Sequence, residues 1–141
     1  MRTGLRQGAE AEVTITVTDD MVARFEDLGL VHPVYATWFM VKHVELASRK
    51  ILLPFLEPDE EAVGHAVSVT HLAPTPVGAT VTARARVSRI DGNQIVCAVE
   101  AHSGGVKIGE GTTVQVVLPA AVLRERFRAI GADAAGDELG Q

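Results

Sequence analysis

The stretch VYATWFMVKHVELASRKILLPFL, residues 34–56, decides the fold of this chain. No proline interrupts it between Thr37 and Pro54, so it predicts a helix of about 25 Å at 1.5 Å per residue, with Thr37 as its N-cap. Its apolar residues cover most of the helix circumference: Trp38, Phe39, Met40, Val41, Val44, Leu46, Ala47, Ile51 and Leu52. A helix that is apolar on several sides is wrapped by other elements, and a single curling sheet would do this.

Segments in which apolar and polar residues alternate predict the strands of that sheet. The turn DGN at residues 91–93 predicts a hairpin between two of them, and Gly109 and Gly111 predict a bulge or bend in the last one. The predicted strands span residues 11–18, 62–72, 79–90, 94–103 and 106–118.

Shorter elements are predicted around this framework. Asp19 and Asp20 are placed to cap a short helix near residues 21–28 that ends at Gly29, and a loop, GLVHPVYA, follows. Residues 119–130 predict a closing amphipathic helix with proline in its first turn, and residues 131–141 predict a flexible acidic tail.

This order of elements predicts an α+β domain of the hot-dog fold, in which an antiparallel sheet of about five strands wraps one long central helix. We expect one such domain over residues 1–130. Because the edge strands of an open sheet are usually paired or protected, a homodimer is the expected assembly.

Composition limits the classes of partner. The net charge of −5 argues against a general nucleic-acid binder, because binding to phosphate backbones depends on clustered Lys and Arg. The single cysteine, Cys97, cannot form an internal disulfide and lies in an alternating apolar run, which is typical of a buried thiol. The N-terminal residues show no signal-peptide core, and no run is long enough to span a membrane, so we expect a cytoplasmic protein.

The chain lacks a phosphate loop, a dinucleotide fingerprint, a Cys/His metal cluster and a GxSxG motif. Three polar residues at unusual places remain as candidates: Thr37 at the start of the helix, Glu45 two turns into it, and His71 on the inner face of a strand. Each has an ordinary structural explanation. Thr37 suits a helix cap, Glu45 suits a solvated salt bridge with Lys42 or Arg49, and His71 suits the edge of a core.

Taken together, the three candidates make chemical sense. An acid, an imidazole and a hydroxyl can share a proton network that prepares an acyl carbonyl for attack. Gly64 would let a substrate approach the backbone closely, and its N–H group could stabilise a developing oxyanion.

At this point the sequence resembles the fluoroacetyl-CoA thioesterase family of single-domain hot-dog proteins. The resemblance covers roughly residues 5–118 and rests on four segments: VYATWFMVKHVELA, PFLEP, GHAVSVTHLAPTPVGATVTARARV and AHSGGVKIGEGT. The combination of Ala-Thr before the helix, glutamate within it and VTH after it is fairly specific to that family.

The resemblance implies that Thr37, Glu45 and His71 form a catalytic triad and that the Gly64 N–H holds the thioester carbonyl. It also implies a homodimer with active sites near the subunit interface, and hydrolysis of a small acyl-CoA ester without a metal or organic cofactor. Whether Glu45 acts as nucleophile or activates water stays open.

Two positions depart from the family pattern and bear on the substrate. Val31 stands where the family's selective member has an aromatic lid residue, so strict fluoroacetyl selectivity is not expected. Trp38 stands where the family has a glycine, and its bulk beside Thr37 could reshape the acyl pocket. Two other functions are compatible with the fold: a hydratase or dehydratase acting on acyl thioesters, and a non-catalytic acyl-CoA or small-ligand binding protein.

Overall fold

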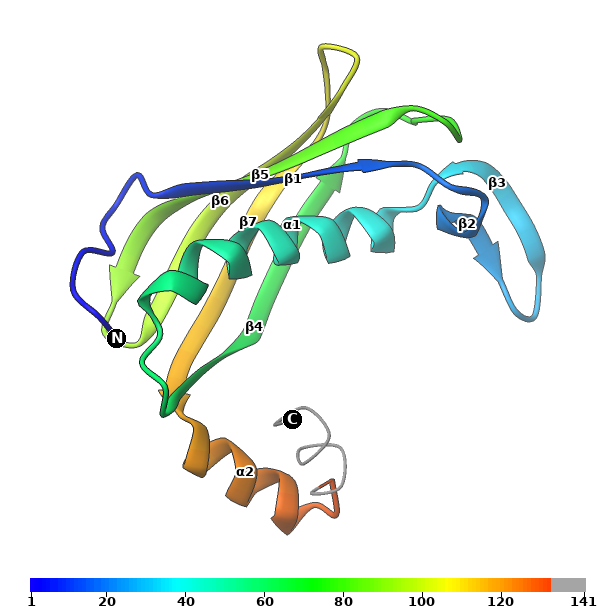
Figure 1. The fold of residues 1–141 in the computed structure, drawn as a ribbon. Helices are drawn as coiled ribbons and strands as arrows, with labels where there is room; N and C mark the ends of the chain where they lie inside the picture. The colour runs from blue at the N-terminus through cyan, green and yellow to red at the C-terminus, as the bar shows by residue number, and fades with distance from the viewer. Residues whose placement is uncertain (133–141) are drawn as a thin grey trace.

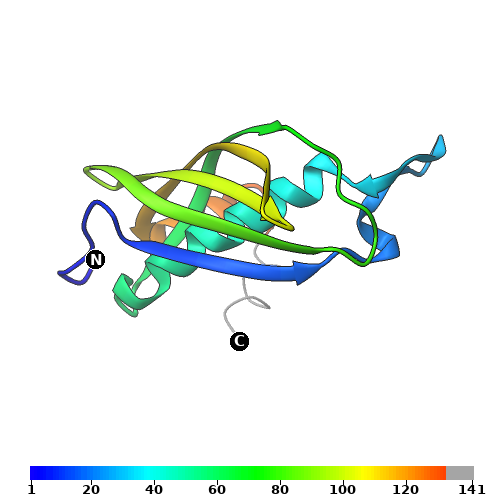
Figure 2. The same cartoon turned by 90° about the horizontal axis from the view of Figure 1, so that it is seen from above.

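The computed structural model describes residues 1–132, in which a curved sheet wraps one long helix (Figure 1). The sheet is antiparallel, has five strands, and is ordered β1-β5-β6-β7-β4. The strands are β1 (Glu10–Thr16), β4 (Glu60–His71), β5 (Thr80–Asp91), β6 (Gln94–Ser103) and β7 (Val106–Pro119). Seen from above, the strands curve over the helix (Figure 2), which confirms the predicted α+β hot-dog fold.

The central helix, α1, spans Thr37–Leu52 and confirms the helix predicted from the opening stretch. The N-cap residue is Ala36, and no side chain caps the helix, so the prediction that Thr37 caps it is wrong. The Thr37 hydroxyl is a hydrogen-bond partner of His71 instead.

The core lies between α1 and the concave face of the sheet. Alternation along the strands supplies one side of it and the apolar stripe of α1 supplies the other. Its fully buried side chains include Met40, Val44, Leu52, Val81, Val87, Ile95 and Ile108. Cys97 belongs to this core, as predicted, and burial raises the pKa of its thiol.

The segment before α1 is a hairpin, so the predictions of a helix at residues 21–28 and of a loop after it are wrong. A 3-10 turn at Asp19–Met21 leads into β2 (Val22–Phe25), which pairs with β3 (Gly29–Tyr35). Gly29 has φ +74°, a conformation used both by helix ends and by hairpin turns, so its signal was ambiguous. The hairpin projects beside the first turn of α1 (Figure 1).

A bulge in β4 decides which side chains face the helix. Gly64 pairs with Gln115 and Ala66 pairs with Val114, so His65 has no partner in the register. Residues seven positions apart on a regular strand point to opposite faces. Because the bulge shifts the alternation by one, Gly64 and His71 share the face turned toward α1.

The two strand glycines predicted to mark a bulge or bend also set how closely the elements pack. The register between β6 and β7 shifts at Gly109, where Ala101 pairs with Gly109 and His102 with Lys107, in agreement with the prediction, whereas the β4–β7 register runs unbroken past both glycines. A Cβ atom at Gly109 would collide with the side chain of Met40, and one at Gly111 would overlap the carbonyl oxygen of Ser68. These glycines therefore let α1 and β4 approach β7 closely.

The last described element is a helix at the far end of α1 from the hairpin (Figure 1). A 3-10 turn, Leu53–Phe55, follows α1, and the closing helix α2 spans Ala120–Ala129, as predicted. Most of the predicted flexible tail lies outside the described residues. Within residues 1–132, no helix is long and apolar enough to cross a membrane.

Candidate active site

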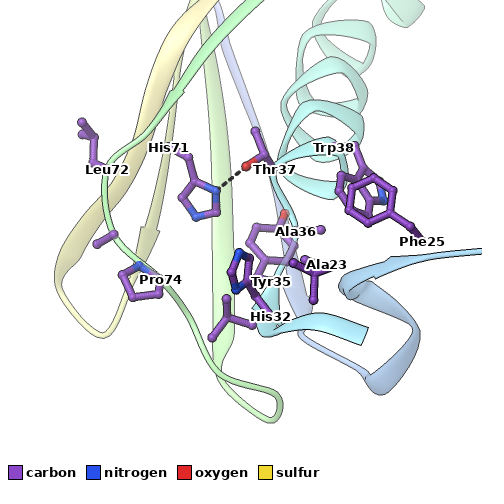
Figure 3. A pocket seen from close by; sticks show the side chains of 13 residues that line it. Ala23, Phe25, His32, Tyr35, Ala36, Thr37, Trp38, His71, Leu72 and Pro74 are labelled. Atoms are coloured by element: carbon purple, nitrogen blue, oxygen red, sulfur yellow. Dashed lines mark hydrogen bonds between the residues drawn. The ribbon is translucent and has the colours of Figure 1, made fainter. Parts of the chain in front are cut away.

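Thr37 and His71 meet at the hairpin end of the molecule. Thr37 is the first residue of α1 and His71 is the last residue of β4. Their side chains lie together because β4 runs along the same side of the helix, and Thr37 Oγ1 is 2.9 Å from His71 Nδ1 (Figure 3). A hydroxyl and an imidazole at this distance can exchange a proton.

This pair forms part of the wall of a cavity of about 470 Å³. The hairpin residues and the loop after β4 supply most of the remaining wall, which is largely apolar (Figure 3). The apolar lining residues are Ala23, Phe25, Val31, Val34, Ala36, Trp38, Leu72, Ala73 and Pro74. An apolar cavity with a few polar groups at one wall is the usual form of a small-molecule site.

Val31 and Trp38, the two predicted substrate-binding positions next to Thr37, both line this cavity. Each is about 40 % exposed, at 42 % and 43 %. The Trp38 ring packs against Phe25 with ring centroids 5.0 Å apart, on the side of α1 away from His71 (Figure 3). Trp38 therefore flanks the cavity and does not fill it.

A buried aromatic pair supports the Thr37–His71 wall from behind. The Tyr35 hydroxyl lies 2.5 Å from His43 Nδ1, and the two rings are nearly parallel. Burial raises the pKa of the Tyr35 hydroxyl, while burial and the Lys42 ammonium lower the pKa of His43. The Tyr35 hydroxyl therefore donates to a neutral His43. Sequence analysis missed this pair, since helix spacing alone gives His43 no partner.

The lowered pKa of His43 predicts a pH dependence of stability. The unfolded chain protonates His43 below about pH 6.5, whereas the lowered pKa means that the folded chain protonates it only at a lower pH, so the free energy of unfolding should decrease as the pH falls through about 6.5. Urea unfolding of His43→Gln, whose amide can accept the Tyr35 hydrogen bond without titrating, should show a shallower pH dependence than the wild type. Equal slopes in the two proteins would contradict a neutral buried His43.

Glu45 does not form the salt bridge that its neighbours on α1 allow. Arg49 pairs instead with Glu61 at 2.8 Å, and the Lys42 ammonium lies over the Phe39 ring. Among residues 1–132, the Glu45 side chain forms no ion pair and no hydrogen bond. Glu45 is exposed, so its carboxylate is accessible to a substrate or to water.

Gly64 is what makes room for Glu45. A Cβ atom built on Gly64 would lie only 3.1 Å from Glu45 Oε1. A side chain at this position of β4 would require the Glu45 carboxylate to shift by a few tenths of an ångström. The structure therefore brings together two of the predicted site residues, Glu45 and Gly64, as it does Thr37 and His71.

Buried polar side chains lie beside Glu45, and sequence analysis did not select them. Ser48 Oγ is 2.7 Å from Thr113 Oγ1, and Gln115 stands opposite Gly64 in the sheet. All three are at most 6 % exposed. The signal was available in β7, where Thr113 and Gln115 occupy the helix-facing positions of the alternating strand.

The two groups are well separated within one chain. Thr37 and Glu45 are eight residues apart on α1, or about 12 Å along its axis. Gly64 and His71 are seven residues apart on β4, or roughly 20 Å. Within one chain, Glu45 therefore does not reach the Thr37–His71 pair.

The described residues hold no group of three or more His, Cys, Asp or Glu side chains arranged to bind a metal ion. The polar groups beside Thr37 and beside Glu45 are three hydroxyls, an imidazole, a carboxylate and an amide. These groups suit proton transfer and the orientation of a substrate.

Comparisons with known proteins agree on one family. Residues 17–121 match the family described as fluoroacetyl-CoA-specific thioesterase. A fluoroacetyl-CoA thioesterase from Streptantibioticus cattleyicolor is 42 % identical over 85 residues, which is 60 % of this chain and 61 % of that protein, so the match spans less than two thirds of the relative.

Two solved structures match over most of their length. A Thermus thermophilus protein described as a thioesterase superfamily member is 47 % identical, with a TM-score of 0.90, over 92 % of this chain and 95 % of that one. A variant of the fluoroacetyl-CoA-specific thioesterase in complex with fluoroacetate and CoA is 33 % identical, with a TM-score of 0.77, over 82 % of this chain and 96 % of that one.

Proposed function

The chain belongs to the fluoroacetyl-CoA-specific thioesterase family, and on that premise we propose that it hydrolyses a small acyl-CoA ester to the free acid and coenzyme A. The observation that carries the proposal is the Thr37–His71 hydrogen bond at the wall of the apolar cavity. The cavity would take the acyl group, and the pair would meet the thioester at its mouth.

A homodimer formed through β4 would complete the site. The other edge strand, β1, is protected by exposed glutamates, Glu10 and Glu12. In contrast, residues 63–70 of β4 contain no Asp, Glu, Lys or Arg, and this strand is an unpaired edge. A long uncharged edge strand is a template for pairing with a second chain.

The geometry of such a pairing joins the two separated clusters. If β4 pairs antiparallel with its copy about a two-fold axis at Ser68, with the bulge residue His65 left out of the pairing, Gly64 lies beside the partner's His71. Glu45, which contacts the position of Gly64, would then face the Thr37–His71 pair of the other subunit. Each dimer would contain two complete sites.

Each residue then has a role in hydrolysis. The Gly64 N–H would donate to the thioester carbonyl, and Glu45 would take a proton from the attacking water. The partner's His71, oriented by the partner's Thr37, would return a proton to the sulfur of the leaving coenzyme A. General acid and base groups of this kind accelerate reactions by roughly 10²- to 10⁴-fold.

The cavity also sets an expectation for the acyl group. Its volume of about 470 Å³ exceeds what a two-carbon acyl group needs, and its wall is largely apolar. With Val31 at the predicted lid position, nothing on the described cavity wall is specific for fluorine. We therefore expect kcat/KM to rise from acetyl-CoA to short branched or four-carbon acyl-CoA esters, because more apolar surface is buried.

The test is release of free thiol from a panel of esters that includes acetyl-, fluoroacetyl-, butyryl-, isobutyryl-, benzoyl- and palmitoyl-CoA. We expect the highest kcat/KM for the short apolar esters and little turnover of palmitoyl-CoA. A preference for fluoroacetyl-CoA over butyryl-CoA would contradict the acyl assignment. No thiol release from any ester would contradict the proposed function.

A further inference from the structure

The side chain of Gln115 is a buried amide with an unused donor. Gln115 is 6 % exposed on the helix-facing side of β7, and its Nε2 atom has no hydrogen-bond partner within the described part of the chain. Leaving a buried donor unpaired is unfavourable, and such groups are usually satisfied by protein or ordered water. The proposed thioesterase reaction gives this residue no role.

Gln115 borders a small polar cavity beside Glu45. The cavity has a volume of about 40 Å³, and it exists because Gly64, the cross-strand neighbour of Gln115, has no side chain. One water molecule occupies about 30 Å³ in the liquid and needs two to four polar partners when buried. The lining residues are Glu45, Ser48, Gly64, Thr113, Val114 and Gln115. The cavity therefore suits a single water.

The hydroxyl of Ser48 has an acceptor position free for such a water. Ser48 Oγ donates to the Val44 carbonyl oxygen at 2.9 Å, so the hydrogen it shares with Thr113 Oγ1 at 2.7 Å comes from Thr113. A hydroxyl oxygen has two lone pairs. One of them accepts from Thr113, and the other remains available.

We propose that this cavity holds the water molecule that attacks the thioester, and that Gln115 is the residue that positions it. The Gln115 amide donates to the water oxygen, and the water donates to Glu45 and to Ser48 Oγ. These three bonds leave one lone pair of the water oxygen for the acyl carbon. The proposal rests on the thioesterase function and adds the position of its second substrate.

The step balances without a further reactant. The water oxygen bonds to the acyl carbon while one water proton passes to Glu45, and the carbon–sulfur bond breaks. Glu45 passes this proton to the imidazole of the partner's His71, which delivers it to the thiolate of coenzyme A, so both residues return to their starting state and the products are the carboxylic acid and the free thiol. Gln115 gains and loses no proton, so its effect comes through the position of the water.

The decisive variant is Gln115→Met, which keeps the volume of the side chain and removes the donor. We expect kcat to fall roughly 10- to 100-fold, with KM changed less than twofold. Because Gln115 Nε2 has no hydrogen-bond partner among the described residues and the volume of the side chain is kept, the midpoint of thermal unfolding should change little. Gln94→Met on β6, outside the cavity, is the matched control and should keep the wild-type kcat.

Two further measurements separate positioning from a structural role. The Kd for a non-hydrolysable thioether analogue of the acyl-CoA should be the same in the wild type and in Gln115→Met. A crystal structure of the wild type should show one ordered water within 3.2 Å of Gln115 Nε2 and of a Glu45 carboxylate oxygen.

The proposal is overturned if Gln115→Met retains the wild-type kcat, if kcat falls only in step with thermal stability, or if the cavity is dry in the crystal. These outcomes differ from failure of the proposed function. If the proposed function failed, the wild type would release no thiol from any ester. The ordered water is tested separately, because the crystal structure that shows it does not depend on turnover.

Discussion

Replacing Glu45 with glutamine lowers kcat for the best acyl-CoA substrate by about 10²- to 10⁴-fold, because the amide cannot accept the proton of the attacking water. The substitution keeps the size of the side chain and its fit against Gly64. Since Glu45 is exposed and takes part in no ion pair among the described residues, the free energy of unfolding should stay within about 0.5 kcal/mol of the wild type.

Thiol release and urea unfolding check this expectation on the same preparations. Glu125→Gln on α2 is the matched control: it neutralises an exposed glutamate that pairs with Arg128 at the surface, and it should keep the wild-type kcat. If Glu45→Gln turns over substrate within threefold of the wild type, Glu45 is not the base.

His71→Ala should reduce kcat by a similar factor of about 10² or more, because the leaving thiolate then loses its proton donor. The Thr37 hydroxyl orients the imidazole through the 2.9 Å hydrogen bond, so removing it should cost less. We expect about tenfold for Thr37→Val and almost nothing for Thr37→Ser, which keeps the hydroxyl.

Steady-state kinetics of the three variants test this order. A Thr37→Ser enzyme as impaired as Thr37→Val would show that the methyl group matters and the hydrogen bond does not. A His71→Ala enzyme with the wild-type kcat would remove the imidazole from the mechanism.

The central helix and the five-strand sheet were predictable from the sequence because their patterns are long and strongly periodic. The apolar residues of α1 and the alternation of β5, β6 and β7 each extend over ten residues or more. The family resemblance is confirmed by the match of residues 17–121 to the family. It was recognisable from the sequence because the segments that carry it are spread through this framework.

The hairpin before α1 and the bulge in β4 were not predictable from the sequence. The β2 strand has only four residues, too few for a period to show, and Gly29 suits either a helix end or a hairpin turn. The bulge at His65 depends on how β4 packs against β7, and no local signal in Gly64 or Ala66 encodes it.

For the candidate site, the sequence predicted a set of residues but not their arrangement. Thr37 and His71 are paired as their proposed chemistry requires, whereas Glu45 lies with Gly64 at a distance of two helical turns. The triad remains a prediction, because joining its members needs a second chain. Thr113 and Gln115 were missed although the alternation of β7 places them on its helix-facing side, and Ser48 was missed because it looks like an ordinary helix residue until the packing of α1 on β7 is known.

Mixing two inactive variants tests the composite site most directly. Glu45→Gln and His71→Ala are purified separately, mixed in equal amounts, and allowed to exchange subunits in mild urea before thiol release is measured. If each site takes Glu45 from one subunit and the Thr37–His71 pair from the other, half of the dimers are mixed, and each has one intact site. The mixture should then recover about a quarter of the wild-type activity. Activity that stays at the level of the two separate variants, after exchange has been verified, would contradict the account.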